Sequence, residues 1–315
     1  MSRHILITGG CGFIGANFVR FVMNHRDDWK ITNLDCLSYS GNPENLADLD
    51  SDRRYTFVHG DIRNEADVNK ALDGVDAVVH FAAESHVDRS ILDSRPFVES
   101  NVMGTQTLLD AVRKTKPETR FVHISTDEVY GSLPLNRPDL LFSETTPIAT
   151  NSPYSASKAA SDMFVRAYHH THGMDTLITR CSNNFGPYQF PEKVIPLFVT
   201  NLIEGKKVPL YGTGENVRDW LHVEDHCEAI LTVLEKGKAG EVYNIGGNNE
   251  RSNLELTHAI LDLMGMGRDM IQPVEDRKGH DLRYAIDASK IKAELGWQPT
   301  RSAWPEALER TVRWY

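Results

Sequence analysis

The stretch "HILITGGCGFIG", residues 4 to 15, joins a short β-branched run to closely spaced glycines. Glycines between a strand and a helix allow a tight turn and let backbone N–H groups approach a pyrophosphate, which the positive end of the helix stabilises. The spacing is Gly-x-x-Gly-x-x-Gly, which differs from the Gly-x-Gly-x-x-Gly of the dehydrogenase fingerprint. The stretch therefore predicts the first turn of a dinucleotide-binding unit, formed by Gly9, Gly12, Phe13, Ile14 and Gly15.

Asp35 strengthens this interpretation. It ends the next expected strand, "KITNLD", 20 residues after Gly15. A carboxylate at that place can accept hydrogen bonds from both ribose hydroxyls and would repel a 2′-phosphate. Taken alone, Asp35 would be read as a turn residue. Together, the glycine turn and Asp35 favour NAD over NADP.

The order of apolar runs indicates the fold class. From residue 4 to about 180, short apolar runs alternate with helical patterns, which is typical of βαβ units with a parallel sheet. After about residue 180, Pro and Gly lie closer together, which suggests loops around a site. We therefore expect an α/β fold: a Rossmann-like doubly wound parallel sheet in residues 1–180 and a smaller C-terminal α/β substrate lobe in residues 181–315. The segment of about 219–238 should pack back on the first domain.

Composition narrows the possible partners. The formal net charge is -10, and Lys and Arg are not clustered, so nucleic acid and membrane surfaces are not expected partners. No apolar run reaches the ~18 residues of a membrane span, and no charged leader precedes the first strand, which favours a cytoplasmic protein. The cysteines and histidines show no metal-ligand spacing, so no metal is expected. Buried free thiols are expected at Cys11, Cys36, Cys181 and Cys227.

A second chemical motif is "YSASK", residues 154 to 158. Tyr154 and Lys158 are four residues apart at an expected helix start, so their side chains share one face. A Lys ammonium beside a phenol stabilises phenolate and lowers the pKa of the phenol. Such a base can take a hydroxyl proton while hydride leaves the same carbon. Tyr-x-x-x-Lys is common by itself and becomes specific behind a glycine turn of the Rossmann type.

With these motifs in view, the chain resembles extended short-chain dehydrogenase/reductases and, within them, nucleotide-sugar 4,6-dehydratases. The resemblance runs from His4 to Tyr315. It rests on "TGGCGFIG", "HFAAESHVDRS", "HISTDEVYG", "SPYSASKAASD", "NNFGPYQFPEKVIP", "LYGTGENVRDWLHVEDH", "YNIGG" and "DRKGHDLRYAID". It implies a tightly bound NAD that is recycled in each turnover, and a homodimer formed through helices that include the one after Tyr154.

The same resemblance extends the cofactor site. Asn101 matches a position that supports the Tyr-Lys pair, although a residue at a helix start would fit equally well. The further cofactor-binding residues that we expect are Asp61, Ile62, Ala82, Ala83 and Asn101, beside Tyr154 and Lys158.

The run "FVHISTDEVYG", residues 121 to 131, predicts a buried strand that ends in Thr126, Asp127 and Glu128. The resemblance implies that these three residues are catalytic together with Tyr154 and Lys158. Oxidation of C4 to a ketone makes the C5 proton acidic, and Glu128 then takes it. Asp127 protonates the departing C6 hydroxyl, and Thr126 donates a hydrogen bond to the C4 oxygen. Hydride returns to C6, giving a 4-keto-6-deoxy sugar.

These roles place two demands on the structure. Asp127 must have a raised pKa to act as an acid, and burial and the charge of Glu128 can both raise it, with the two carboxyls titrating as a pair. Successive strand residues face opposite sides, so both acids can reach one sugar only if the strand has already turned at Thr126.

The substrate site rests mainly on the resemblance. It implies that dTDP-glucose is the substrate, and UDP-glucose stays open because thymine and uracil differ by one methyl group. Arg218 suits phosphate oxygens, which a guanidinium binds in a bidentate way. Ser85 fits a substrate contact or a turn equally well, and Lys278 stands where the family often has Pro. The expected substrate-binding residues are Ser85, Asn183, Glu192, Lys193, Tyr211, Arg218, Asn253, Arg277 and His280.

Other functions on the same fold stay as alternatives. A nucleotide-sugar 4-epimerase or a UDP-glucuronate decarboxylase would share the glycine turn and the Tyr-Lys pair. Neither eliminates the C6 oxygen as water, so neither needs Asp127 with Glu128. An NAD-sensing protein without catalysis would have no use for Tyr154 with Lys158.

Overall fold

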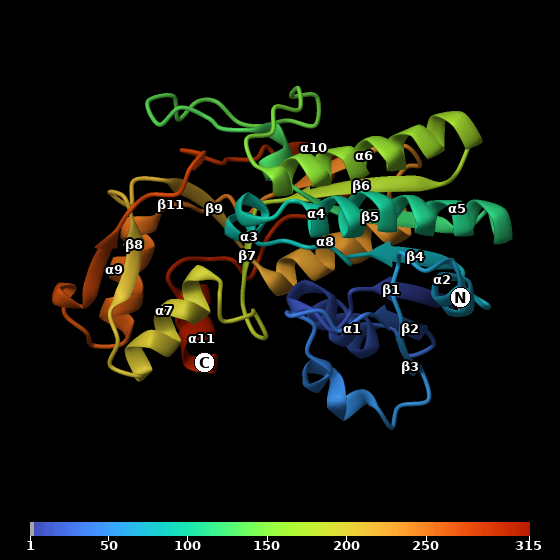
Figure 1. The fold of residues 1–315 in the computed structure, drawn as a ribbon, viewed down its shortest axis with the longest axis horizontal. Coiled ribbons are helices and arrows are strands. Elements are labelled where there is room, and N and C mark those ends of the chain that lie inside the picture. The colour runs from blue at the N-terminus through green and yellow to red at the C-terminus, as the bar shows by residue number, and fades with distance from the viewer. Residues whose placement is uncertain (1–2) are drawn as a thin grey trace.

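The computed structural model describes residues 3–315, and its centre is a seven-stranded sheet in which every neighbouring pair is parallel (Figure 1). The strand order is β10-β6-β5-β4-β1-β2-β3. The chain therefore runs outward from β1 in both directions, which is the doubly wound arrangement. The strands are β1 His4–Thr8, β2 Lys30–Asp35, β3 Tyr55–His59, β4 Ala77–His80, β5 Arg120–Thr126, β6 Thr176–Cys181 and β10 Val242–Ile245.

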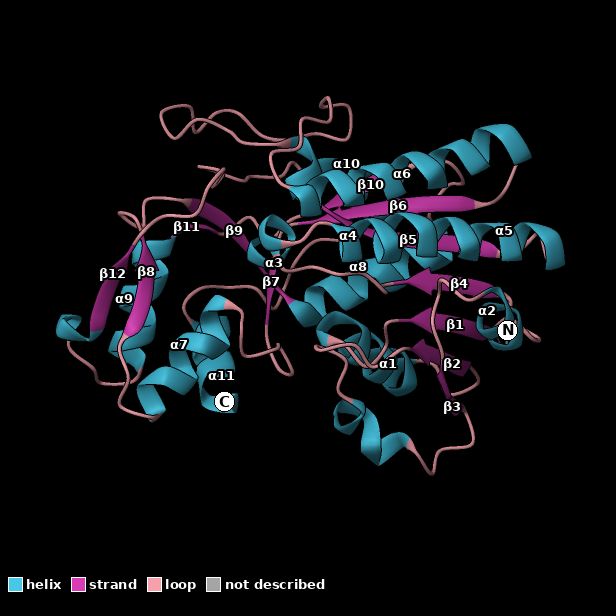
Figure 2. Ribbon diagram, viewed as in Figure 1, coloured by secondary structure: helices cyan, strands magenta, loops and turns pink. Residues whose placement is uncertain are grey.

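Helices cover both faces of this sheet (Figure 2). On one face, α1 (Phe13–His25) packs against α8 (Val223–Lys236). On the other face lie α2 (Glu65–Ala71), α5 (Thr105–Thr115) and α6 (Pro153–His172). Because successive strand residues point to opposite faces, Ile5 and Ile7 join the core with α1, whereas Leu6 joins the core with α5. Burial on both faces explains why these strands lack polar alternation.

A smaller lobe lies beside the edge of the main sheet that carries the carboxyl ends of the strands (Figures 1 and 2). It has a three-stranded sheet of order β11-β9-β7 and a two-stranded sheet of β12 and β8. Its helices share a core of their own. The elements are β7 Asn183–Phe185, α7 Val194–Ile203, β8 Val208–Tyr211, β9 Val217–His222, β11 Glu250–Ser252, α9 Asn253–Leu263, β12 Ile271–Val274 and α11 Glu306–Trp314.

The predicted fold class is confirmed: a Rossmann-like parallel sheet with a smaller C-terminal α/β lobe. The two parts exchange segments. Besides α8, strand β10 lies in the main sheet, and α10 (Ser289–Leu295) packs against β10. The division at residue 180 stays a prediction. Short helical turns complete the chain: η1 Pro43–Leu49, α3 Val87–Leu92, α4 Arg95–Phe97, the π-helix η2 Val98–Gly104, η3 Asp127–Tyr130 and η4 Arg268–Met270.

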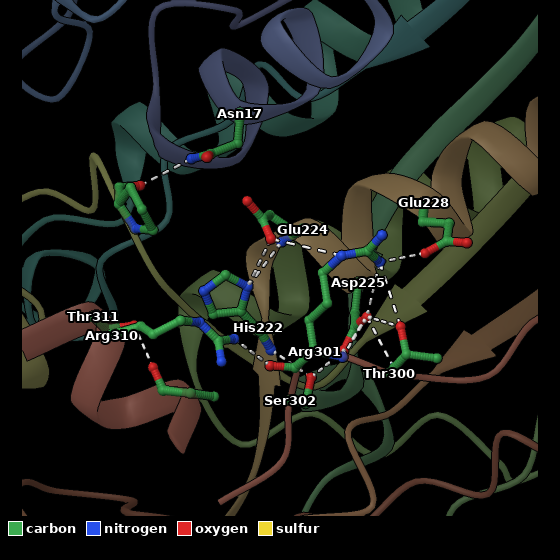
Figure 3. A network of polar contacts seen from close by, with 12 residues as sticks. Asn17, His222, Glu224, Asp225, Glu228, Thr300, Arg301, Ser302, Arg310 and Thr311 are labelled. Atoms are coloured by element: carbon green, nitrogen blue, oxygen red, sulfur yellow. Dashed lines mark hydrogen bonds and ion pairs between the residues drawn. The ribbon is translucent and has the colours of Figure 1, made fainter. Parts of the chain in front are cut away.

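A buried carboxylate ties the C-terminal segment to α8 (Figure 3). Asp225 is fully buried, and its oxygens accept hydrogen bonds from the Arg301 amide (2.8 Å) and the Ser302 hydroxyl (2.6 Å). The Ser302 hydroxyl in turn accepts from the amide of His222, at the end of β9 (2.8 Å). Hydrogen bonds to a charged group contribute about 1.5–3 kcal/mol each. This network therefore fixes the segment that leads into α11.

The four cysteines are free thiols, and three of them are buried. The expectation of burial is wrong for Cys36, which is exposed because it lies just after the carboxyl end of β2. Within residues 3–315, no helix is long and apolar enough to cross a membrane, and no group of three or more side chains could hold a metal ion.

Candidate active site

A cleft of about 550 Å³ opens at the carboxyl ends of the parallel strands. This is where ligands bind in open α/β sheets, because the loops diverge there and helix N-termini point inward. The cleft contains both the glycine turn after β1 and the Tyr154–Lys158 pair of α6. Of the predicted site residues, its lining includes Gly9, Gly12, Phe13, Ile14, Gly15, Asp35, Asp61, Ile62, Ala82, Ala83, Ser85, Thr126, Glu128, Tyr154, Lys158, Asn183, Glu192 and Lys193.

The glycine turn has no room for side chains at Gly9 and Gly15. Gly9 has a positive φ of 72°, and a Cβ there would lie 2.6 Å from the Ala82 nitrogen. A Cβ on Gly15 would lie 2.2 Å from the Gly9 oxygen. Gly12 caps α1 without a side-chain hydrogen bond, so backbone N–H groups at this helix start are free to bind an anion. The turn fits the pyrophosphate of a dinucleotide.

Asp35 is held at the cleft by backbone donors. One carboxylate oxygen accepts from the Leu37 amide (2.8 Å) and the other from the Cys11 amide (2.9 Å). Burial raises the pKa of Asp35, while these two hydrogen bonds lower it. The carboxylate is therefore fixed in orientation, and its remaining lone pairs can accept the hydroxyls of a ribose.

Replacing Asp35 tests this role. We expect Asp35→Asn to weaken NAD binding about 10- to 100-fold, since a charged hydrogen bond contributes roughly 1.5–3 kcal/mol and 1.4 kcal/mol is tenfold. NADP binding should weaken less or improve, because the repulsion of its 2′-phosphate is removed. Titration of cofactor-stripped protein with both dinucleotides gives the ratio of the two affinities. An unchanged ratio would show that Asp35 does not read the ribose.

Asn101 does not line the cleft. It lies buried in the middle of η2, where its side-chain amide donates to the Glu84 carbonyl (2.9 Å) and the Ser157 hydroxyl (2.8 Å) and accepts from the Glu84 amide (2.8 Å). Ser157 lies between Tyr154 and Lys158 on α6. Asn101 thus braces α6 and the loop that holds Ser85.

The strand β5 ends at Thr126, and Asp127 and Glu128 begin the 3-10 turn η3. The demand that the strand turn before the acids is therefore met. The Thr126 hydroxyl accepts a hydrogen bond from the Glu128 amide (3.3 Å) and donates one to Asp127 (3.3 Å). Glu128 lines the cleft, whereas Asp127 is 2% exposed and lies behind its surface.

The two carboxyls differ in electrostatic surroundings. Burial, the Glu128 carboxylate and Asp219 together raise the pKa of Asp127 well above its ordinary value. Burial also raises the pKa of Glu128, but the charges of Arg218 and Lys193 oppose this. Of the two carboxyls, Asp127 is therefore the one that more readily keeps its proton, which suits an acid beside Glu128 as the base.

Tyr154 and Lys158 share one face of α6, and both are buried. The Lys158 ammonium donates to the Ile124 carbonyl (2.7 Å) and lies 3.4 Å from His123 Nε2. Burial and the Glu128 carboxylate raise the pKa of Tyr154 well above its ordinary value, and a hydrogen bond with Thr126 opposes this. The expectation of a lowered phenol pKa is wrong for this structure, because burial and a neighbouring carboxylate raise the pKa of Tyr154.

The predicted substrate residues fall into two groups. Ser85, Asn183, Glu192 and Lys193 line the cleft, and the Lys193 ammonium donates to the Ser85 carbonyl (3.2 Å). The second group lies in the smaller lobe outside the cleft lining. It comprises Tyr211, Arg218, Asn253, Arg277 and His280.

Contacts relate this second group to the cleft. The Arg277 guanidinium stacks on Tyr211 at 5.1 Å, and the rings of Tyr211 and His280 are 6.4 Å apart. Burial raises the pKa of Glu128, and the charges of Arg218 and Arg277 lower it. Both guanidinium groups therefore act electrostatically on a residue that lines the cleft. Asn253, at the start of α9, has only a backbone connection to this region, from its amide to the Asn216 carbonyl (2.9 Å).

Sequence reasoning missed a contact across the mouth of the cleft. The Tyr39 hydroxyl donates to Glu192 (2.9 Å), and Arg89 also donates to Glu192 (3.2 Å) while stacking on the Tyr39 ring at 3.8 Å. Glu192 lies more than a hundred positions from both of them, and only the fold brings them together. Other lining residues that were not predicted, such as Asn184, Gln189 and Phe190, lie in the quoted run "NNFGPYQFPEKVIP".

The glycine turn, Asp35 and the Tyr154–Lys158 pair at one cleft define an extended short-chain dehydrogenase/reductase. A family model described as GDP-mannose 4,6 dehydratase matches residues 6–308, and the chain belongs to this family. A dTDP-glucose 4,6-dehydratase of Streptomyces niveus is 53% identical, covering 99% of this chain and 92% of that protein.

Solved structures agree with this assignment. A dTDP-glucose 4,6-dehydratase of Streptomyces venezuelae, with NAD and TYD bound, superposes with a TM-score of 0.95 at 52% identity, covering 99% of this chain and 96% of that chain. The UDP-glucose 4-epimerase of Thermus thermophilus, in complex with NAD, has a TM-score of 0.89 at 29% identity, covering 99% and 98%. The fold is thus shared with epimerases, and the sequence is much more similar to the dehydratases.

Proposed function

We propose that this chain catalyses the NAD-dependent 4,6-dehydration of dTDP-glucose to dTDP-4-keto-6-deoxyglucose and water. The observation that carries this proposal is that Asp127 and Glu128 follow the end of β5, where Glu128 lines the same cleft as Tyr154 and Lys158 of α6. Oxidation of C4 requires Tyr154 and Lys158. Elimination of water also requires Asp127 and Glu128. The Streptomyces niveus relative is named for this reaction.

The glycine turn and Asp35 would hold NAD, with the pyrophosphate at the start of α1 and the ribose at the carboxylate. When bound, NAD supplies a hydride acceptor for C4 and a hydride donor for C6. Tyr154 takes the C4 hydroxyl proton, and Thr126 donates a hydrogen bond to the C4 oxygen. The Lys158 ammonium stabilises the Tyr154 phenolate, which becomes a phenol when it takes this proton.

Elimination then depends on the difference between the two carboxyls. Once C4 is a ketone, the C5 proton is alpha to a carbonyl, and Glu128 abstracts it. Asp127, protonated because of burial and the Glu128 charge, gives its proton to the C6 hydroxyl, which leaves as water. Glu128 returns a proton to C5 when C6 receives hydride. The cofactor ends in its starting oxidation state, so no net oxidation occurs.

The substrate diphosphate and base lie toward the smaller lobe in this proposal. Arg218, Arg277 and His280 provide positive charge or donors there, and Lys193 with Asn183 lies nearer the sugar. Tyr211 carries the Arg277 guanidinium on its ring and so orients it.

The protein is proposed to act as a homodimer in the cytoplasm. Large apolar side chains are exposed on α6 and on the neighbouring turns, and α6 contacts both α3 and η2. Exposed apolar patches of this kind mark interaction surfaces. The residues are Leu92, Val98, Met103, Met163 and Phe164.

Mass spectrometry of the reaction tests the proposed function. Purified protein is incubated with dTDP-glucose and, separately, with UDP-glucose, without added NAD. We expect the sugar nucleotide to lose one water, faster with dTDP-glucose. An unchanged mass even with NAD supplied would overturn the proposal, and an isomeric product on chromatography would favour a 4-epimerase.

A further inference from the structure

A fully buried carboxylate stands behind the Tyr-Lys pair and has no part in the reaction described above. Asp162 lies one helical turn after Lys158 on α6 and has no exposed surface. One of its oxygens accepts from Arg180 Nε (2.9 Å), and the other lies 3.5 Å from His123 Nε2. Arg180 also donates to the Tyr130 hydroxyl (3.0 Å), so the guanidinium is fixed on the sheet.

His123 lies between Asp162 and the Lys158 ammonium. Its Nε2 atom is 3.4 Å from Lys158 Nζ and 3.5 Å from Asp162 Oδ1. Burial and the Lys158 charge lower the pKa of His123 well below its ordinary value, so the imidazole is neutral. A neutral imidazole does not cancel the attraction between the ammonium and the carboxylate. The buried cluster therefore contains two cations, Lys158 and Arg180, and one anion between them.

An ammonium that is only 3% exposed needs such a counter-charge. Burial disfavours the charged form of a lysine, and an ion without a partner in the interior usually becomes neutral instead. Burial lowers the pKa of Lys158 to about 8, and the Asp162 carboxylate is the largest opposing influence. Asp162 lies a single helical turn from the catalytic lysine on α6.

We propose that Asp162 is a positioning residue for the hydride step, which keeps the buried Lys158 side chain charged beneath Tyr154. This inference rests on the proposed function and deepens it. Removing the carboxylate leaves the buried Lys158 ammonium and the Arg180 guanidinium without the anion that acts on both. The lysine then loses its proton at a lower pH, and the phenolate of Tyr154 loses its stabilising charge.

In the described part of the chain, the other charged or titratable groups that face Lys158 provide no second carboxylate to balance its buried ammonium. From β5 comes neutral His123, and from β4 comes His80, whose own pKa burial and the Lys158 charge lower to about 3. From β6 come the Cys181 thiol, whose pKa burial raises, and Arg180. On α6 itself stand Tyr154 and Asp162. Among these named groups around Lys158, the carboxylate is Asp162.

The test is the pH dependence of kcat for Asp162→Asn with dTDP-glucose. We expect the alkaline limb of the profile to move down by about 1–3 pH units, the shift that a neighbouring charge typically makes. The variant should lose about 10- to 100-fold in kcat near pH 8 and much less near pH 6. Asp162→Glu, which keeps the charge, should restore the alkaline limb.

Asp225→Asn is the matched control, because Asp225 is also a fully buried carboxylate and lies in α8, away from Lys158. Asp225→Asn should lower the melting temperature and leave the alkaline limb of the pH profile of kcat unchanged. If Asp162→Asn does not fold, Lys158→Arg gives a second test: a guanidinium does not titrate, so the alkaline limb should vanish. An equal loss at every pH in Asp162→Asn, or a limb that persists in Lys158→Arg, would overturn the inference while wild-type dehydration of dTDP-glucose still stood.

Discussion

Glu128→Gln should stop the reaction after C4 oxidation. The amide cannot abstract the C5 proton, and general-base catalysis typically contributes about 10²- to 10⁴-fold, so kcat should fall by that factor. Tyr154 and Lys158 are untouched, so hydride should still leave C4. We expect substrate addition to produce the near-ultraviolet absorbance of reduced cofactor, which persists because elimination is blocked.

Glu241→Gln is a suitable control for this variant. Glu241 forms an ion pair with Lys290 (2.7 Å) outside the cleft, and its loss removes a carboxylate without touching the site. Its turnover should equal that of the wild type. Normal turnover in Glu128→Gln, or loss of cofactor reduction together with turnover, would contradict the assignment of Glu128 as the base for C5.

Tyr154→Phe should abolish every step, including cofactor reduction. The variant lacks the phenolate oxygen that takes the C4 hydroxyl proton, and we expect a loss of about 10²- to 10⁴-fold in the rate of oxidation. Single-turnover absorbance after mixing with dTDP-glucose measures this step directly. The contrast with Glu128→Gln separates oxidation from elimination, since only one of the two variants should show reduced cofactor.

Tyr168→Phe provides the comparison on the same helix. Tyr168 lies on α6, and its hydroxyl donates to Asp110 (2.9 Å) away from the cleft. Removing that hydroxyl costs a hydrogen bond and should leave the oxidation rate unchanged. Rapid cofactor reduction in Tyr154→Phe would show that another group takes the C4 proton.

Local patterns predicted much of the fold and many of the residues that line the cleft. The glycine turn, Asp35 and the Tyr154–Lys158 pair could be read because each depends on spacing within one βα unit. The end of the strand at Thr126 could also be expected, since polar residues follow an apolar run. These features need no knowledge of which strands are neighbours.

Features that depend on distant parts of the chain could not be read. The return of β10 to the main sheet and the contact of Tyr39 with Glu192 both require the folded arrangement. The raised pKa of Tyr154 depends on burial and on Glu128, which spacing alone does not reveal. Asp162 lay in the quoted run "SPYSASKAASD", yet its counter-charge role is visible only beside Arg180 and His123.

The most direct test of the account is the fate of deuterium placed at C4 of dTDP-glucose. In the proposed reaction, the hydride taken from C4 returns to C6 of the same molecule, with loss of one water. Mass spectrometry and NMR of the product should therefore show a 4-keto-6-deoxy sugar that carries the deuterium at C6. A product without the label at C6, or an isomer with the mass of the substrate, would contradict it.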